Sequence, residues 1–503
     1  MPILATKQVI SEFDALTENR KQEIRCTPDE VTITGTRYYV SNEGDDTNDG
    51  LTPATPWKTL GRVGEFEFEE GDAILFRRGD LFRGGIKLAA PNMTVGAYGV
   101  GEKPKFYGAP RDLKEPSLWE EVDPVHHIWK WGEKILDAGS IVFNEGELLS
   151  IKLIPSYIGG RFVCRDDETK PFVMAEEMIR DLDMYWHFED NMTTRPSKGE
   201  DFPIPDPIGG FGDLYLRCDR GNPALAFDSI EAISEQVVFR LRSKAANAHF
   251  DNLCIKYAGF AIGAGGPCVK GLHVTNCEMG WIGGQIQHYY GTDPNYPEGR
   301  RGTVTRFGNA IEIYGGCDDY VVENCYIYQC YDAGITHQIN TCGKFYSMTN
   351  IRYADNLIEY CVYGIEYFLD QMNGDTESYM KGVEMCGNII RHSGYGWGQQ
   401  RHNVHTPAHI KGWSYINTAS DFSIHHNFFG EANYRMLHLV AQKAESCPVM
   451  YENTYLQNED KPLGQYGANE EAEPPILPFD RSVDESIASV FGDTNATVYL
   501  IEK

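Results

Sequence analysis

The sequence predicts an all-β solenoid, a chain that coils through short β-strands whose successive turns stack on one another. A weak repeat, in which an Asn precedes apolar residues, recurs at Asn252, Asn276, Asn324, Asn356, Asn388 and Asn427. Three copies lead into a Gly–hydrophobic step, at Gly334-Ile335, Gly364-Ile365 and Gly396-Trp397. Gly is abundant, at 51 of 503 residues, as turns between short strands require. Such units bury their apolar side only against their neighbours, and this is what indicates a solenoid.

The N-terminal segment has a different period. Val9, Ile10, Phe13 and Leu16 recur at helical spacing among charged residues. We therefore expect residues 1–36 to form an amphipathic helix. Because a solenoid needs its open end covered, this segment is predicted to be a capping helix.

Two phrases after the helix carry a family resemblance. Residues 38–60 read YYVSNEGDDTNDGLTPATPWKTL, and residues 71–85 read GDAILFRRGDLFRGG. The pair resembles the opening turns of right-handed parallel β-helix proteins of the pectate-lyase-like class, especially carbohydrate-active enzymes. The resemblance implies the first β-helix turns at 37–110, further turns at 237–460, and chemistry on a carbohydrate.

Between residues 111 and 236 the repeat disappears. This stretch contains Trp119, Trp129, Trp131 and Trp186. It resembles the β-rich insertion of some β-helical glycosidases, including certain β-xylosidases, so we expect an inserted subdomain. Its Trp side chains either wall a sugar site or pack in a small core. Residues 461–503 are acidic and Pro-rich, and we expect a C-terminal tail or cap.

Composition limits the partners. The formal net charge of −28 disfavours nucleic acid and anionic membranes, which would be repelled, and a neutral sugar is the easier substrate. The N-terminus lacks the features of a secretory signal and no stretch has the ~20 apolar residues of a membrane span, so we expect a cytoplasmic protein. Cys277 and Cys325 follow repeat Asn residues, which predicts reduced cysteines stacked in the core. Whether the chain forms a homo-oligomer stays open.

Alternation along the strands places chemistry on one side of the solenoid. Taking the Ile after each repeat Gly as inward, the next residue points outward. One outward column is then predicted to read Glu312, Thr336, Glu366, Gly398 and His438.

The spacing between repeats predicts where loops gather. The repeat Asn residues from 276 to 427 lie about 48, 32, 32 and 39 residues apart, more than the twenty-odd of a minimal turn. We assign the surplus to four loops after the column strands, at 288–303, 339–348, 369–380 and 399–419. Loops clustered on one side of a solenoid usually mark its binding side, so a walled cleft is expected beside the column.

Two carboxylates in that column suit glycoside hydrolysis. Glu312 and Glu366 would have backbones roughly 9–10 Å apart, two strand spacings. Hydrolysis needs one carboxyl to protonate the leaving oxygen and another to activate water or attack the sugar. Asp370 is a rival for either role. The sequence does not distinguish retention from inversion.

Further residues near the column suit sugar binding. Aromatic rings stack on sugar faces, and polar side chains bond hydroxyls. The candidates are Trp281, Tyr289, His337, Gln338, Gln399, Arg401, Trp413 and His438. Strict alternation turns His337 inward unless its strand ends at Thr336. We expect no cofactor, although Asp370, Asp375 and Glu377 could chelate calcium.

Three functions remain open. The first is a glycoside hydrolase on a neutral oligosaccharide, with long loops favouring exo action. The second is a polysaccharide lyase or uronate epimerase, for which Arg391, Arg401 and Lys411 supply cations. The third is a carbohydrate-binding β-helix without catalysis.

Overall fold

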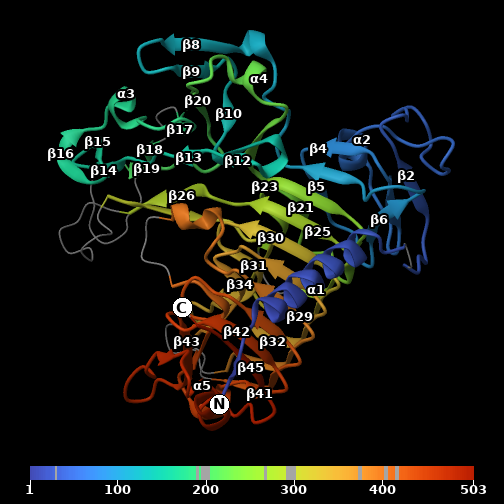
Figure 1. Ribbon diagram of the computed structural model, residues 1–503. Coiled ribbons are helices and arrows are strands. Elements are labelled where there is room, and N and C mark those ends of the chain that lie inside the picture. The colour runs from blue at the N-terminus through green and yellow to red at the C-terminus, as the bar shows by residue number, and fades with distance from the viewer. Residues whose placement is uncertain are drawn as a thin grey trace.

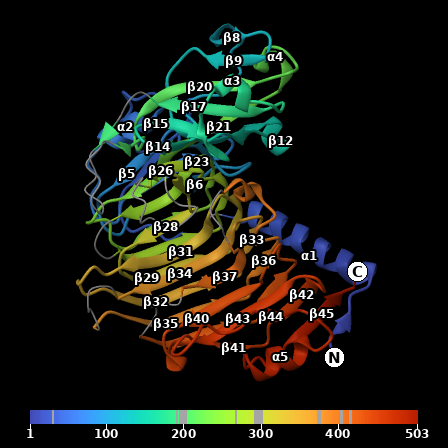
Figure 2. The ribbon, with the colours of Figure 1, turned by 90° about the vertical axis from the view of Figure 1, so that its left-hand side faces the viewer.

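The computed structural model confirms the predicted parallel β-helix and carries a subdomain above one end of the coil (Figure 1). The structure describes residues 1–28, 31–188, 192–193, 204–265, 269–290, 302–371, 377–401, 406–413 and 418–502. Each turn contributes three strands, so the coil has three faces, and the later turns stack in chain order away from the subdomain (Figure 2). None of the described helices is long and apolar enough to cross a membrane.

Face 1 consists of the strands that follow the repeat Asn residues. They are β4 (Leu81–Arg83), β7 (Lys105–Tyr107), the first half of β23 (Cys254–Gly265), β25 (Glu278–Ile282), β30 (Tyr326–Cys330), β33 (Leu357–Glu359), β36 (Ile389–Arg391), β39 (Phe428–Gly430), β42 (Thr454–Asn458) and β45 (Thr497–Ile501).

Face 2 comes next along each turn. Its strands are β5 (Ile86–Leu88), β21 (Ile230–Leu241), the second half of β23, β28 (Ile311–Tyr314), β31 (Ala333–Asn340), β34 (Tyr363–Asp370), β37 (Ala408–Gly412), β40 (Leu437–Ala441) and β43 (Pro462–Ala468). A short antiparallel strand, β44 (Leu477–Pro478), pairs with β43.

Face 3 completes the turn. Its strands are β2 (Arg37–Val40), β3 (Ala73–Arg77), β6 (Thr94–Tyr98), β22 (Ala248–Asp251), β24 (Val269–Thr275), β29 (Cys317–Glu323), β32 (Ser347–Ala354), β35 (Tyr379–Cys386), β38 (Ala419–His425) and β41 (Val449–Tyr451). Inward side chains of all three faces form one continuous apolar core, which includes the free thiols Cys277 and Cys325.

The repeat Asn residues sit at the corner between faces 3 and 1, and their amides bond along the coil. Asn356 Nδ2 donates to Asn388 Oδ1 (2.9 Å), Asn388 to Asn427 (2.9 Å), and Asn427 to Asn453 (3.0 Å). The ladder ends on Asp493, whose carboxylate accepts from Asn453 at 2.8 Å. Because an amide both donates and accepts, each Asn satisfies a buried neighbour, which explains the repeat.

The N-terminal helix, α1 (Lys7–Arg25), lies obliquely across the outer side of face 1 (Figure 1). It follows β1 (Ile3–Leu4), which pairs with the last strand, β45, and it runs back towards the earlier turns. Phe13 stacks on Phe428, with ring centroids 4.3 Å apart, and Arg25 at the other end pairs with Glu278. A helix of 19 residues spans about 28 Å, which matches about six strand spacings.

The inserted subdomain has its own β core. One sheet contains β8 (Trp119–Asp123), β9 (Ile128–Trp131), β10 (Ile135–Leu136), β13 (Ile151–Lys152), β17 (Asp183–Phe188) and β20 (Phe211–Arg217); another contains β14 (Ser156–Ile158), β15 (Arg161–Cys164) and β16 (Asp167–Pro171). Trp119, Trp131 and Trp186 are buried in that core, so they pack rather than wall a sugar site. An antiparallel strand, β11 (Ala138–Phe143), pairs with β21 and joins the subdomain to the coil.

The long connections flank face 2 on both sides, which corrects the prediction that all follow its strands. Residues 283–310, with the hairpin of β26 (Gln285–Tyr289) and β27 (Val304–Phe307), precede β28, and residues 392–407 precede β37. The connections after β31, β34 and β37 leave on the other side. Residues 291–301, 372–376, 402–405 and 414–417 lie outside the described part of the chain.

Candidate active site

The outer side of face 2 carries one column of polar side chains. Strand register aligns Glu312, Thr336, Glu366, Lys411, His438 and Gln465. The predicted column is correct except at its fourth position, where Lys411 replaces Gly398. Gly398 lies in a short 3-10 helix, Trp397–Gln400, because the chain leaves the coil after Arg391 and rejoins it only at Ala408.

Glu312 is half-buried and surrounded by donors. Asn309 Nδ2 bonds its Oε2, which also accepts from Gln338 Nε2 at 3.3 Å and lies 3.5 Å from the Thr336 hydroxyl. Asn309 is held in turn, because its Oδ1 accepts from the Ala333 amide at 2.7 Å. The position of this carboxylate is therefore fixed by the neighbouring strand.

Glu366 is more deeply buried, at 6% exposure. Trp413 Nε1 donates to its Oε1 at 2.7 Å. Lys411, the next residue in the column, lies with its Nζ 3.0 Å from the Tyr363 hydroxyl and 3.7 Å from the centre of a Trp413 ring. The Lys411 ammonium and the Trp413 indole thus both lie beside Glu366, from the neighbouring strand β37 and the residue after it.

A buried ion pair lies at the corner before the column. Arg401 bonds the carboxylate of Asp332, and both side chains are largely buried. Asp332 raises the pKa of both Glu312 and Glu366 by its charge. Sequence reasoning missed Asp332, which directly precedes the strand that carries Thr336; its place beside the repeat step Gly334-Ile335 was the available signal.

Both glutamates have a pKa well above the ordinary value of a carboxyl group. Burial, then the charges of Glu366 and Asp332, raise the pKa of Glu312 to about 7. Burial and Asp332 also raise the pKa of Glu366 to about 7, against the opposing effects of Lys411 and Trp413. Burial lowers the pKa of Lys411 to about 8. Each carboxyl is therefore available in both its protonated and its ionised form near neutral pH.

A second, mostly aromatic column runs beside the first. It consists of the residues two positions further along each strand, which point to the same side: Tyr314, Gln338, Phe368 and Trp413. The rings of Phe368 and Trp413 lie 6.4 Å apart, edge to face, and Tyr314 is 37% exposed. Sugar rings pack on such side chains, so acid groups and a stacking surface share one side of face 2.

Asp370 lies apart from the pair. It ends β34, opposite Asn340, four residues beyond Glu366 and so about 13 Å along the strand. Burial raises its pKa. Of its possible calcium partners, Asp375 is outside the described residues.

Three predicted binding residues do not reach the site. Trp281 packs with Tyr331 and Trp397 in a separate apolar cluster. Tyr289 is buried in the subdomain core, because the β26–β27 hairpin docks there. His337 points into the coil as strict alternation requires, 2.7 Å from the Tyr353 hydroxyl, and burial lowers its pKa to about 3.

The far end of the column is cationic. Arg435, 4% exposed, bonds Gln465 and the Thr406 hydroxyl, and among the described residues neither it nor Lys411 forms an ion pair. His438 follows Lys411 in the column, and burial followed by the charges of Arg435 and Lys411 lowers its pKa to about 3. Two buried cations therefore flank a neutral imidazole.

A cavity of about 590 Å³ separates the subdomain from this side of the coil. Gln399 and Arg401 line it from the connection between β36 and β37, and Lys152, Arg165 and Arg180 line it from the subdomain. Arg401 therefore borders both the cavity and the acidic site.

Fold and site together define a parallel β-helix protein with two glutamates, one half-buried and one buried, in one column on an outer side. No protein-family profile matches the chain. An alignment over 101 residues with a lacto-N-biosidase of Bifidobacterium longum subsp. longum shows 36% identity, and it covers 18% of this chain and 6% of that protein.

Solved structures with similar coils are distant in sequence. A GH136 lacto-N-biosidase from Eubacterium ramulus aligns with 99% of this chain and 71% of its own, at 13% identity and a TM-score of 0.39. XylC in complex with xylose aligns with 92% of this chain and 83% of its own, at 11% identity and a TM-score of 0.43. A rhamnogalacturonan lyase aligns with 85% and 75%, at 11% identity and a TM-score of 0.37.

Proposed function

We propose that this protein is a glycoside hydrolase in which Glu312 and Glu366 act as general acid and general base. The observation that carries the proposal is the pair itself: two glutamates in one column, each with a pKa of about 7. Proton transfer is most efficient when the pKa of the group lies near the working pH. The local similarity to a lacto-N-biosidase supports the same reaction class.

The spacing of the pair favours inversion. The two backbones are two strand spacings apart, about 10 Å, and only the small Thr336 stands between them. Inverting enzymes separate their carboxyls by roughly 6.5–9.5 Å to admit a water, whereas retaining enzymes need about 5 Å. We therefore propose single displacement by water.

The neighbours of each glutamate assign the roles. Lys411 adjoins Glu366 and stabilises its ionised form, which suits the base. The side chains that hydrogen-bond Glu312 are the neutral Asn309, Thr336 and Gln338, so it keeps its proton more readily than Glu366 and suits the acid. The aromatic column would hold the sugar ring across both groups.

Leaving groups of different acidity test the assignment. Glu312→Gln should lose most activity on natural linkages, which need protonation, but retain it on aryl glycosides whose phenol leaves unassisted. Glu366→Gln should lose activity on both, because water is not activated. Equal retention in both variants would refute the pair. Product size and anomeric configuration, followed by NMR, would show chain-end cleavage and inversion.

A second candidate, a lyase or epimerase acting on uronates, has one specific observation in its favour. Lys411 and Arg435 are buried beside the two glutamates, and among the described residues neither forms an ion pair. The carboxylate of a uronate would supply the anionic partner. This weighs against the neutral substrate that the net charge favoured. Unsaturated products, detected by ultraviolet absorbance on uronate polymers, would establish the lyase; their absence with hydrolysis would establish the hydrolase.

A further inference from the structure

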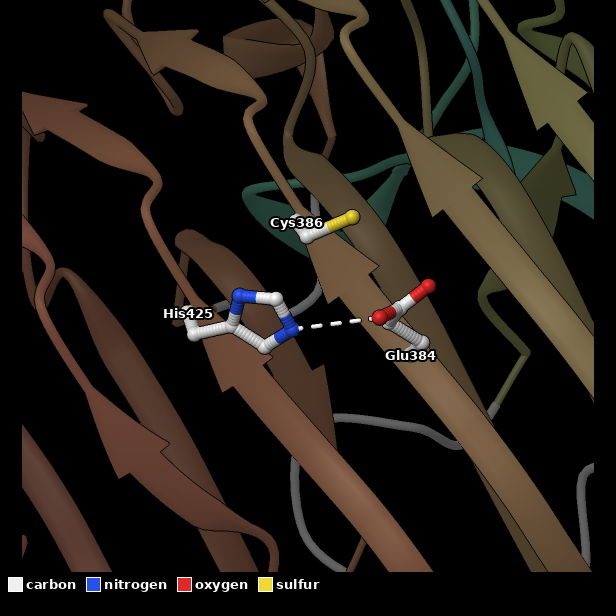
Figure 3. Close-up of side chains that lie close together, drawn as sticks. All are labelled: Glu384, Cys386 and His425. Atoms are coloured by element: carbon white, nitrogen blue, oxygen red, sulfur yellow. Dashed lines mark hydrogen bonds and ion pairs between the residues drawn. The ribbon is translucent and has the colours of Figure 1, made fainter.

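A second group of reactive side chains lies on the outer side of face 3. Glu384 and Cys386 alternate on β35 and so point to one side. His425 on β38 is directly opposite Cys386 in the strand register, and Figure 3 shows the three side chains converging. The cluster belongs to a different face from the proposed catalytic pair.

The ligand atoms of the three side chains lie within 4.8 Å of one another. His425 Nε2 is 3.3 Å from Glu384 Oε1. A thiolate, an imidazole and a carboxylate are donors that zinc accepts together, and three protein ligands leave a fourth position for water. We propose that Glu384, Cys386 and His425 form a zinc site.

The surroundings of His425 support this assignment independently. Its other ring nitrogen, Nδ1, lies 2.8 Å from His426 Nδ1, and His426 Nε2 lies 2.6 Å from Glu452 Oε2. A metal-binding His usually donates its second N–H to such a partner, which fixes the ring and raises its basicity. Tyr451 stacks on the same imidazole at 4.4 Å and 9°. The ring is thus oriented before any metal arrives.

Arg352 now occupies the position next to these ligands. Its Nε donates to Glu384 Oε2 at 2.9 Å, and its Nη2 lies 3.8 Å from Cys386 Sγ. Its Nη1 also pairs with Glu323 at 3.0 Å, so the guanidinium keeps a partner when zinc takes Glu384. Zinc and Arg352 therefore compete for one carboxylate.

Binding must also release a proton. An ordinary cysteine thiol carries its S–H bond near neutral pH, whereas zinc binds the thiolate. Forming the zinc–sulfur bond breaks that S–H bond and sends the proton to solvent. Affinity should therefore increase with pH, with one proton released per metal bound by Cys386.

The test titrates the untagged 503-residue chain with Co²⁺, which reports thiolate ligation through its charge-transfer band, and then displaces the Co²⁺ with Zn²⁺. We expect one equivalent to bind with that band. Cys386→Ser should abolish the band, and His425→Asn should weaken binding by at least the roughly 10–100-fold that loss of a ligand's outer partner costs. Cys342→Ser is the matched control, since Cys342 is an exposed thiol elsewhere, and it should leave the band unchanged.

Arg352→Gln tests the competition without removing a ligand. It should tighten binding by about 10-fold or more, because a cation leaves the site. Absence of the thiolate band in the natural protein, or its persistence in a folded Cys386→Ser variant, would overturn the proposal. Circular dichroism of each variant shows that the fold is intact.

Discussion

The outer sides of faces 1 and 2 both carry glutamates withdrawn from solvent, but among the described residues the two in the column of face 2 form no ion pair, whereas Glu278 on face 1 does. On face 1, Arg25 bonds Glu278 through two nitrogens, at 2.9 and 3.0 Å, and Lys256 lies 3.4 Å away. Burial alone would raise the pKa of Glu278, yet Arg25 and Lys256 lower it to about 2. On face 2, Glu312 and Glu366 have pKa values of about 7.

The difference teaches how one ladder serves two purposes. Both columns repeat at the same strand spacing, but α1 brings opposite charges to face 1 and seals it. No described helix covers the column of face 2. A buried charge with a bonded partner stabilises the fold, and a buried carboxyl left near neutrality is suited to chemistry.

The largest expected effect is on activity, and it distinguishes the proposed catalytic glutamate of face 2 from the structural glutamate of face 1. Glu366→Gln should lower kcat about 10³-fold or more while leaving the fold intact, because it removes a group that transfers a proton. Glu278→Gln should do the reverse, with kcat preserved and stability reduced. Steady-state kinetics and urea unfolding on both variants measure the contrast. Loss of kcat in Glu278→Gln at full folding would break the comparison.

Sequence patterns predicted what the ladder repeats. The Asn and Gly steps gave the coil, and alternation placed Glu312, Thr336, Glu366 and His438 in one column. The position of Lys411 in the column was not predicted, because a long connection precedes its strand and counting residues does not show where the strand begins. Contacts between distant segments were equally hidden.

Surface aromatics showed the same limit. Trp281 and Trp413 were indistinguishable as candidates, and only the packing of Trp281 in a cluster with Tyr331 and Trp397 removed it. Tyr289 was lost in the same way, because its hairpin docks on the inserted core. A pattern reports which side of a strand a residue faces, not what later covers it.

The next largest effect concerns stability on face 1. Arg391 is buried and bonds Asp14 of α1 at 2.8 Å, and it also bonds Glu431. Arg391→Ala would remove a buried cation from Glu431, which would keep His392 at 3.4 Å, so unfolding should become easier by about 3 kcal/mol. Urea unfolding measures this, and hydrolysis per folded molecule should not change. A stability within 0.5 kcal/mol of the natural protein, roughly the range of ordinary surface substitutions, would show that α1 is not held by charge.

The two faces should respond oppositely to pH. Glu366 has a folded pKa of about 7, above its ordinary 4.5, so the folded state binds more protons between these values and stability falls as pH rises through them. For Glu278, with a folded pKa of about 2, stability is lost as pH falls below 4.5.

Glu366→Gln removes the first dependence. The free energy of unfolding of the variant, compared with that of the natural protein, should therefore be more favourable at pH 8 than at pH 5. The expected change in this difference is about 2–3 kcal/mol for a pKa shift of this size. Denaturant midpoints of both proteins at the two pH values give the answer. An equal difference at pH 5 and pH 8 would contradict a raised pKa at Glu366.

The smallest effect distinguishes two tryptophans that the sequence treated alike. Trp413→Phe keeps a ring but loses the bond to Glu366 at 2.7 Å, which favours the ionised carboxylate. The pKa of Glu366 should rise, so kcat/KM should fall about 10-fold at pH 6 and its acid limb should move to higher pH. Trp281→Phe, within the packed cluster, should shift neither. Because a purely structural loss would lower kcat/KM at every pH alike, the displaced limb is what ties Trp413 to the protonation of Glu366.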